Sequence, residues 1–301
     1  MTTESSTQPR WRTVSSPTSK TLTSAVWTAA GPLAVGEAGT VVGRPPDGDW
    51  RVVIDSGPNA RSATLNAATV SDDGERSWFA GSSGVLGLWD TASERKSDFS
   101  APDEKTSSWC AITISGEPGE ERLVVANSSG EVVRADLDAD QCPTFGGVVK
   151  PGSGSTLSAL DAADSIVYGT DTSGNVYALR DDEWTRIGIR NAQVNFTDLT
   201  AAQTGLFVSG DGGLVYRYDV PCRNWTPVRA APQTLRGIDA ETDRIVAVGD
   251  GGGITRCTSD QRWTLEATET ERVLRSVALG PTDVAVGDGG TIVERRAEGE
   301  R

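Results

Sequence analysis

Histidine is absent from all 301 residues, and this absence excludes more chemistry than any other feature of the chain. It excludes the Ser-His-Asp and Cys-His nucleophile pairs and histidine-ligated zinc, and it removes the commonest general base. Carboxylate, tyrosine, arginine and lysine side chains are the catalytic groups that remain. We therefore expect a protein that is not an enzyme and that uses no cofactor.

Cysteine is scarce and poorly spaced for metal binding. The four cysteines are Cys110, Cys142, Cys222 and Cys257. No two of them form the Cys-x-x-Cys pair that zinc sites often contain. Free thiols are the expected state in a chain without a secretion signal. Cys110 and Cys142 fall within one repeat of the chain, and the sequence alone leaves open whether they form a disulfide.

Long apolar runs are also missing. No stretch reaches the ~18 apolar residues that a membrane helix needs. Residues 1–10 lack the basic patch and the apolar core of a signal peptide. These absences predict a cytoplasmic protein without a membrane span.

Lysine is rare, and acidic residues exceed basic ones. Only four of the 28 basic residues are lysine, and 42 acidic residues make the formal net charge −14. Such a surface disfavours nucleic acid and anionic membranes as partners, because binding to both depends on phosphate neutralisation. High Asp, Glu and Thr with little Lys is typical of proteins from halophilic archaea, where molar salt shortens the Debye length to roughly 3 Å and screens self-repulsion. An ordinary acidic protein is the alternative.

The chain does contain a short glycine-rich turn that recurs seven times between β-rich runs. The turns are Gly36-Glu37-Ala38-Gly39, Gly81-Ser82-Ser83-Gly84, Asn127-Ser128-Ser129-Gly130, Asp171-Thr172-Ser173-Gly174, Gly210-Asp211-Gly212-Gly213, Gly249-Asp250-Gly251-Gly252 and Gly287-Asp288-Gly289-Gly290. Their last glycines are spaced by 45, 46, 44, 39, 39 and 38 residues. A period of about 40 with strands on both sides of the turn predicts an all-β, seven-bladed β-propeller of four-stranded antiparallel blades.

Each repeat is expected to contain four strands with distinct patterns. The first strand has a small residue near its start, such as Ser24 or Ala67, because strands converge at the ring axis. The second is rich in Val and Ile, which suits a strand buried on both faces. The fourth opens with tryptophan in five repeats, at Trp11, Trp50, Trp184, Trp225 and Trp263. In repeats two and three, we expect the fourth strand near Phe99 and Phe145.

The phase of the repeat predicts how the ring closes. The seventh repeat ends after its third strand, at residues 291–295, and the chain begins with an unmatched tryptophan strand at residues 11–14. The N-terminal strand is therefore expected to complete the last blade, which removes the exposed sheet edges of an open array. One propeller domain is predicted over 11–296, between a disordered N-terminal tail (1–10) and a C-terminal tail (297–301).

The repeated Val-Gly-Asp-Gly-Gly-[Thr/Gly]-Ile segment, with tryptophan opening the outer strand, resembles the WD40/YVTN/BNR-like propellers over residues 11–296. Within that superfamily it is most similar to the Ycf48/HCF136-type photosystem II assembly factors. The resemblance implies an assembly factor that binds partner proteins through an arginine-rich surface and has no catalytic chemistry. The matching regions of this chain are mixed or acidic. We expect a monomeric, non-catalytic scaffold with a protein partner.

Two arginines and one aspartate are the candidate ligand-binding residues. Arg236 and Arg275 occupy the same place in adjacent inner strands, where a propeller encloses its channel, and Asp198 lies beside that place in the preceding repeat. Guanidinium groups in this arrangement suit a small anion or a carboxylate. The alternative is that each arginine pairs with a nearby acid such as Asp239 or Asp198, since buried charges need partners.

Five carboxylates are the candidate metal ligands. Because each glycine-rich turn joins the same two strands of its repeat, all seven turns should emerge on one face. That rim is expected to carry Glu37, Asp171, Asp211, Asp250 and Asp288. Oxygen-rich rims can bind Ca²⁺ or Mg²⁺, so a small-ligand or divalent-cation binding module is one alternative function. Turn chemistry alone is the other explanation, because Asp-Gly tolerates the positive φ of tight hairpins.

A carbohydrate-active hydrolase or lyase of the sialidase-like propeller type is a further alternative. The segment Ser71-Asp72-Asp73-Gly74-Glu75-Arg76-Ser77-Trp78 resembles the Asp-box of that superfamily, with its glycine displaced by one residue. An ordinary Asp-Gly turn is expected there. The missing histidine, the poor arginine triad and the lack of an export signal favour the scaffold.

Overall fold

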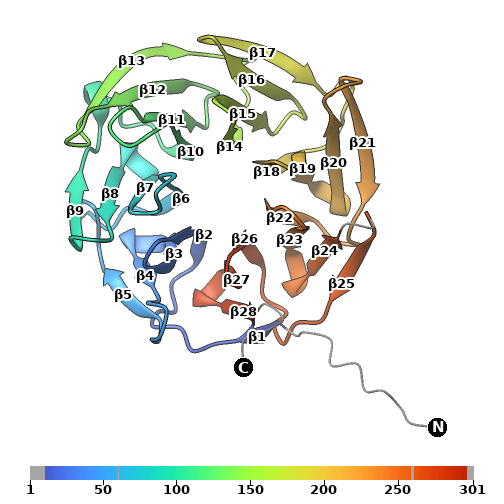
Figure 1. Cartoon of the computed structure of the whole chain (residues 1–301), viewed down its shortest axis with the longest axis horizontal. Helices are drawn as coiled ribbons and strands as arrows, with labels where there is room; N and C mark the ends of the chain where they lie inside the picture. The colour runs from blue at the N-terminus through green and yellow to red at the C-terminus, as the bar shows by residue number, and fades with distance from the viewer. Residues whose placement is uncertain (1–10, 60, 259–260, 297–301) are drawn as a thin grey trace.

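The computed structural model describes residues 11–59, 61–258 and 261–296, and over these residues the chain forms seven antiparallel sheets of four strands each. Figure 1 shows the sheets arranged as blades around a common axis, with the chain following the ring once. Blades 1 to 6 each consist of four consecutive strands, and blade 7 joins the two ends of the chain. The predicted all-β seven-bladed propeller is confirmed.

The two strands of each blade nearest the axis form its buried half. The inner strands are β2 (Leu22–Thr28), β6 (Leu65–Val70), β10 (Trp109–Ser115), β14 (Leu157–Ala163), β18 (Phe196–Ala202), β22 (Leu235–Ala240) and β26 (Leu274–Ala278). The second strands are β3 (Gly31–Gly36), β7 (Arg76–Gly81), β11 (Arg122–Asn127), β15 (Ile166–Asp171), β19 (Gly205–Gly210), β23 (Arg244–Gly249) and β27 (Thr282–Gly287). In β23 every residue after Arg244 is buried, which accounts for its run of Val and Ile.

The other two strands carry each blade outward to the circumference. The third strands are β4 (Val41–Gly43), β8 (Leu86–Asp90), β12 (Val132–Leu137), β16 (Val176–Arg180), β20 (Leu214–Asp219), β24 (Ile254–Thr258) and β28 (Ile292–Arg296). The outer strands are β5 (Arg51–Ile54), β9 (Arg95–Asp98), β13 (Pro143–Val149), β17 (Glu183–Gly188), β21 (Asn224–Arg229), β25 (Trp263–Glu266) and β1 (Arg12–Thr13). Phe145 lies within β13 as predicted, and Phe99 directly follows β9.

The ring closes through the N-terminal strand, as the phase of the repeat predicts. β1 pairs antiparallel with β28 and is the outer strand of blade 7. Arg12 lies opposite Glu294, and the N–H of Val14 donates to the carbonyl oxygen of Ile292 at 3.1 Å. The predicted tails, 1–10 and 297–301, lie outside the described residues, so the domain bounds remain a prediction.

The hydrophobic core consists of layers between neighbouring blades. Trp11 of blade 7 is fully buried in a cluster with Val246 and Val248 of blade 6. Trp50 of blade 1 is buried in a cluster with Val284 of blade 7. The outer-strand tryptophans thus pack one blade against the preceding one, and each inter-blade layer buries apolar surface that a single blade would expose.

Five of the seven glycine-rich turns are short 3-10 segments, η1 (Glu37–Gly39), η2 (Ser82–Gly84), η4 (Asp211–Gly213), η5 (Asp250–Gly252) and η6 (Asp288–Gly290). A sixth segment, η3 (Pro102–Glu104), connects blades 2 and 3. In blades 3 and 4, the side chains of Asn127 and Asp171 close the turn by accepting backbone N–H groups. Among the described residues, no helix has the length and apolarity of a membrane span.

Candidate functional site

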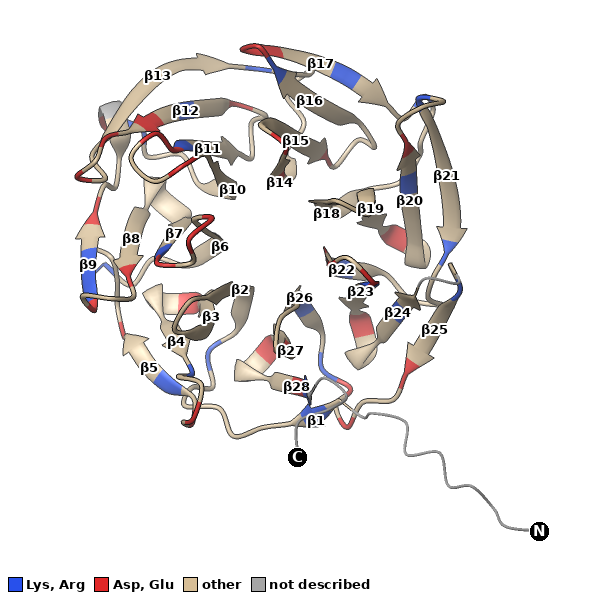
Figure 2. Ribbon diagram, in the orientation of Figure 1, with Lys and Arg blue, Asp and Glu red and all other residues tan. Residues whose placement is uncertain are grey.

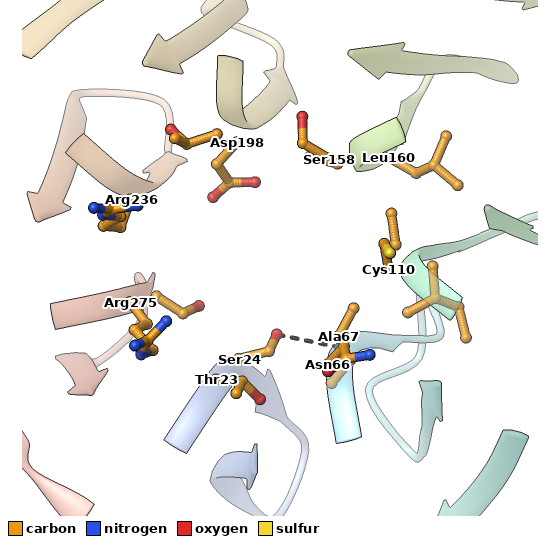
Figure 3. A pocket seen from close by; sticks show the side chains of 16 residues that line it. Thr23, Ser24, Asn66, Ala67, Cys110, Ser158, Leu160, Asp198, Arg236 and Arg275 are labelled. Atoms are coloured by element: carbon orange, nitrogen blue, oxygen red, sulfur yellow. Dashed lines mark hydrogen bonds between the residues drawn. The ribbon is translucent and has the colours of Figure 1, made fainter. Parts of the chain in front are cut away.

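The second side chains of the seven inner strands line the mouth of the central channel. They are Thr23, Asn66, Cys110, Ser158, Thr197, Arg236 and Arg275. Six of them, all but Cys110, line a cavity of about 510 Å³ that extends to two of the glycine-rich turns, where Thr172 and Asp211 line it. A second cavity of about 180 Å³ is lined by all seven. Figure 3 shows the two arginines on one side, with Asn66 and Cys110 across from them. The volume of the larger cavity is within the range of small-molecule binding sites.

Each arginine is paired with a carboxylate on the turn of its own blade. Arg236 Nε and Nη2 donate to Asp250 Oδ1 and Oδ2 at 2.8 and 3.1 Å. Arg275 Nε donates to Asp288 Oδ1 at 2.5 Å. The hydrogen bond that Arg236 donates to Asp250 raises the pKa of Arg236 above its ordinary value, against the opposing effect of burial. The structure therefore joins the two predicted sets, the channel arginines and the rim carboxylates, into one constellation.

Each arginine thus pairs with a nearby acid, as the alternative from the sequence states, but the two acids named there, Asp239 and Asp198, are the wrong ones because they bind backbone groups. Asp161, Asp198 and Asp239 each accept the N–H of the following residue with Oδ1. Their Oδ2 atoms accept an N–H from the next blade, at 2.8 Å from Ala201, 2.9 Å from Ile238 and 2.8 Å from Leu279, which directly follows β26. Neighbouring inner strands belong to separate sheets, so these side chains bridge blades 4 to 7.

The three bridging aspartates are half-buried in the channel wall, and desolvation dominates their titration. It raises the pKa of Asp161 to about 6 and the pKa values of Asp198 and Asp239 to about 7. The backbone hydrogen bonds favour the charged form and oppose this change. For Asp198, the neighbouring charges of Asp161 and Asp239 add to the increase.

Two serines make the same bridge and were not anticipated from the sequence. Ser24 Oγ accepts the N–H of Ala68, and Ser276 Oγ accepts the N–H of Ala25. Ser24, Asp198 and Ser276 occupy the same place in their repeats, the place expected to require a small residue. The sequence did contain a signal for this bridge: three repeats have serine or aspartate at that position. A polar side chain between two sheets needs a hydrogen-bond partner.

The rim carboxylates that do not pair with arginine have other partners. Glu37 Oε2 accepts the N–H of Thr21, and Asp211 Oδ2 accepts from Asn195 Nδ2, each at 2.9 Å. Asp171 is buried rather than on the rim. It stands one position earlier in its turn than the other four acids, so its side chain points into the blade.

Asp171 closes its turn and binds a tyrosine. Its Oδ1 accepts the N–H groups of Ser173 and Asn175, and its Oδ2 accepts the hydroxyl of Tyr177 at 3.0 Å. Burial, followed by the charge of Asp171, raises the pKa of Tyr177 to about 12. The expectation that Asp171 lies on the rim is therefore wrong.

No three His, Cys, Asp or Glu side chains in residues 11–59, 61–258 and 261–296 gather in a way that could hold a metal ion. Figure 2 shows acidic residues spread over the turns of many blades and basic residues on outer strands such as β5, β9 and β17. Cation binding by the exposed rim carboxylates stays a prediction, which calorimetric titration with Ca²⁺ tests.

Two smaller questions from the sequence have clear answers. The segment that resembles an Asp-box is a turn between β6 and β7, in which Ser71 Oγ donates to Asp73 Oδ1 and Gly74 has φ +75°. Cys110 and Cys142 do not form a disulfide. Both findings agree with the simpler interpretation of the sequence.

Seven four-stranded blades closed by an N-terminal strand define a seven-bladed β-propeller. No protein-family model and no curated protein matches the chain. By structure, 1566 chains are similar, so the likeness identifies a fold that serves many functions.

Three of the similar solved structures cover nearly the whole chain. U3-55K has a TM-score of 0.79 at 13% identity, over 96% of this chain and 100% of its own. YCF48 bound to D1 peptide has a TM-score of 0.76 at 12% identity, over 97% and 96%. The mitotic checkpoint complex contains a chain with a TM-score of 0.78 at 14% identity, over 99% and 98%. Identities this low establish the fold alone.

Proposed function

We propose that this protein is a non-catalytic scaffold that binds a protein partner at the circumference of the propeller. The observation that carries the proposal is where exposed apolar side chains lie. All six of the described large hydrophobic residues with exposed side chains are on outer strands or the loop before β21: Val52, Val148, Val149, Val220, Val228 and Leu265. They are spread over blades 1, 3, 5 and 6, and Val148 and Val149 are the pair that is adjacent in the sequence. Exposed apolar side chains that lie next to one another are the ones that suggest a contact site.

β13 is the outer strand best suited to a partner. It is seven residues long, and Val148 and Val149 near its end are 44% and 49% exposed. Its outer backbone edge is unpaired, and an added Cβ at Gly147 would meet no atom within 4 Å. An extended segment of a partner can therefore add a strand to this edge, with main-chain hydrogen bonds for affinity and the valines for apolar contact.

The comparisons support binding of a polypeptide by this fold. One similar structure is described as YCF48 bound to D1 peptide and another as the mitotic checkpoint complex. The hydrogen bonds of the channel aspartates argue against a glycosidase, because such an enzyme needs a pair of carboxyl groups that face the substrate. Both carboxylate oxygens of Asp198 and of Asp239 accept backbone N–H groups instead.

Affinity capture of the tagged protein from its own cells, crosslinked at native salt and followed by mass spectrometry, tests the proposal. Val148→Asp places a charge on the proposed edge, and Leu265→Asp makes the same change at an outer-strand residue with 60% exposure in blade 6. We expect a stoichiometric protein with the wild type and with Leu265→Asp, and its loss with Val148→Asp. Recovery of no stoichiometric protein with the wild type contradicts the scaffold function, and equal recovery with both variants contradicts the β13 surface.

The acidic composition supports a finer inference about the setting of this scaffold. A net charge of −14 with only four lysines suits a cytoplasm with molar salt, in which charge repulsion is screened. We infer a cytoplasmic protein of a halophilic archaeon, and the salt dependence of its stability tests that inference.

A further inference from the structure

The mouth of the channel is chemically two-sided. Two adjacent blades contribute the donor side, Arg236 and Arg275. Four other blades contribute the acceptor side, which consists of Thr23, Asn66, Ser158 and Thr197. All six residues line the same cavity, and Figure 3 shows the arginines facing Asn66 across the opening.

The donor side retains unused N–H groups after its ion pairs are formed. Arg236 uses Nε and Nη2 with Asp250, and Arg275 uses Nε with Asp288. The side chains are 42% and 43% exposed, and ion pairs this exposed contribute little to stability. The main effect of the two ion pairs is on orientation, because each carboxylate fixes the plane of its guanidinium group. Nη1 of both arginines stays available to a ligand.

The three hydroxyl groups of the acceptor side donate their hydrogens to backbone carbonyl groups, and Asn66 uses one of its two amide N–H groups in the same way. Thr23 Oγ1 donates to Leu65 O at 2.6 Å, Thr197 Oγ1 to Leu235 O at 2.8 Å and Ser158 Oγ to Thr170 O at 3.3 Å. Asn66 donates through Nδ2 to the carbonyl oxygen of Trp109 at 2.7 Å. Each of these side chains therefore offers oxygen lone pairs to the cavity, and they attract hydroxyl groups.

We propose that the channel mouth binds a small polyhydroxylated carboxylate, a ligand of the sugar-acid class. Its carboxylate lies against the Nη groups of Arg236 and Arg275, and its hydroxyls donate to the acceptor side. A neutral polyol would leave the guanidinium groups without an anion, and an alkyl carboxylate would leave the oxygen acceptors without donors. Either loss costs affinity, because desolvated polar groups need partners.

The acids around the mouth favour one negative charge over two on the ligand. Asp211 lines the same cavity as Arg236, and the carboxylates of Asp250 and Asp288 formally balance the charges of the two arginines. A phosphate dianion meets more repulsion from these carboxylates than a carboxylate does. Asp211 itself adds an acceptor for a ligand hydroxyl.

Calorimetric titration of the full chain with three probes at high KCl tests the proposal. Gluconate carries both groups, sorbitol carries only the hydroxyls, and hexanoate carries only the carboxylate. We expect gluconate to bind at least about tenfold more tightly than either of the other probes, the equivalent of one well-made charged hydrogen bond. No heat with millimolar gluconate, or equal affinity for hexanoate, would overturn the proposal.

Three variants connect the binding to these side chains. Arg236→Gln with Arg275→Gln should weaken gluconate by at least about tenfold, whereas Arg229→Gln should leave it unchanged, because Arg229 bonds to the Gly212 carbonyl and lines neither channel cavity. Asn66→Asp adds a charge across the opening without altering the arginines and should also weaken gluconate, so the test survives if the double variant fails to fold. Unchanged binding in Asn66→Asp and in a folded double variant contradicts the proposal.

Discussion

Trp11 Nε1 donates a hydrogen bond of 2.6 Å to Glu266 Oε2, although the two residues are 255 positions apart in the sequence. The bond joins the N-terminal end of the chain, in blade 7, to the outer strand of blade 6. Glu266 Oε2 also lies 3.4 Å from Nε of Arg295, which is on β28, the strand that pairs with β1. Closure of the ring thus combines strand pairing, a buried indole and an ion pair at one seam.

Trp11→Ala should destabilise the ring strongly. The side chain is fully buried between blades 6 and 7, and loss of a buried tryptophan costs about 3–5 kcal/mol. Thermal unfolding at high salt measures the change. Trp225→Ala is the control, because Trp225 occupies the same repeat position but bonds to Ile187 within a continuous part of the ring. A loss in Trp11→Ala no larger than in the control would contradict a special role of the closing strand.

Two adjacent glycines of one turn should differ sharply in their tolerance of alanine. Gly251 and Gly252 have φ of +66° and +69°, but a Cβ on Gly251 meets nothing within 4 Å whereas one on Gly252 would lie 1.9 Å from the Thr270 carbonyl oxygen. Ala38 occupies the position of Gly251 in blade 1, with φ +56°. We expect Gly251→Ala to cost about 1–2 kcal/mol and Gly252→Ala at least about 3 kcal/mol.

Urea unfolding of the two glycine variants side by side provides the measurement. Both substitutions add the same methyl group in the same left-handed conformation, so the difference between them isolates the backbone clash. Equal losses would show that conformational strain alone determines the cost at this turn.

The stability of the ring should fall as the pH rises from 5 to 8. Asp161 has a folded-state pKa of about 6, and Asp198 and Asp239 have values of about 7, whereas an unfolded aspartate titrates near about 4. Between these pKa values the folded state therefore binds more protons than the unfolded state. The stability that these carboxyl groups contribute is fully present below the pKa of the unfolded state and is lost as the pH rises through the pKa of the folded state. Melting temperatures at pH 5 and pH 8 measure this decline.

The variant Asp198→Ser keeps the hydrogen bond between the blades but removes the carboxyl group that titrates. Serine occupies the same place at Ser24 and Ser276, where its hydroxyl accepts the N–H of the next blade. The variant should therefore reduce the difference in melting temperature between pH 5 and pH 8 while the blades stay joined. Asp47→Ser, in an exposed turn, removes a charge without touching the channel. An equal pH response in wild type and Asp198→Ser would contradict the role of this carboxyl group.

The melting temperature should rise with salt concentration. The 42 acidic residues exceed the 28 basic ones, and screening shortens the range of their repulsion from about 10 Å at 0.1 M to about 3 Å at 1 M. Unfolding scans across KCl concentrations, with sucrose at matched osmolality as the control, measure this effect. A melting temperature that does not change, or that falls with KCl, would contradict adaptation to molar salt.

Local patterns in the sequence were sufficient to predict the repeat and the closing strand. Glycine-rich turns recur at a nearly constant spacing, and an unmatched strand at one end corresponds to a missing strand at the other. The position of Asp171 was mispredicted, because alignment on the last glycine places it one residue before Glu37. That single offset turns its side chain inward, where Tyr177 and Asn175 bind it.

The sequence by itself determined the number of blades and the order of their strands, because the glycine-rich turns recur at a nearly constant spacing between β-rich runs. Only the tertiary structure decided which charges meet. Arg236 lies two residues before a backbone group that Asp198 binds, yet its own partner is Asp250, because the turn of each blade folds back over the start of its inner strand. Pairing between these charged side chains depends on distances of a few ångströms within one blade, and such distances arise only when the strands of that blade have paired.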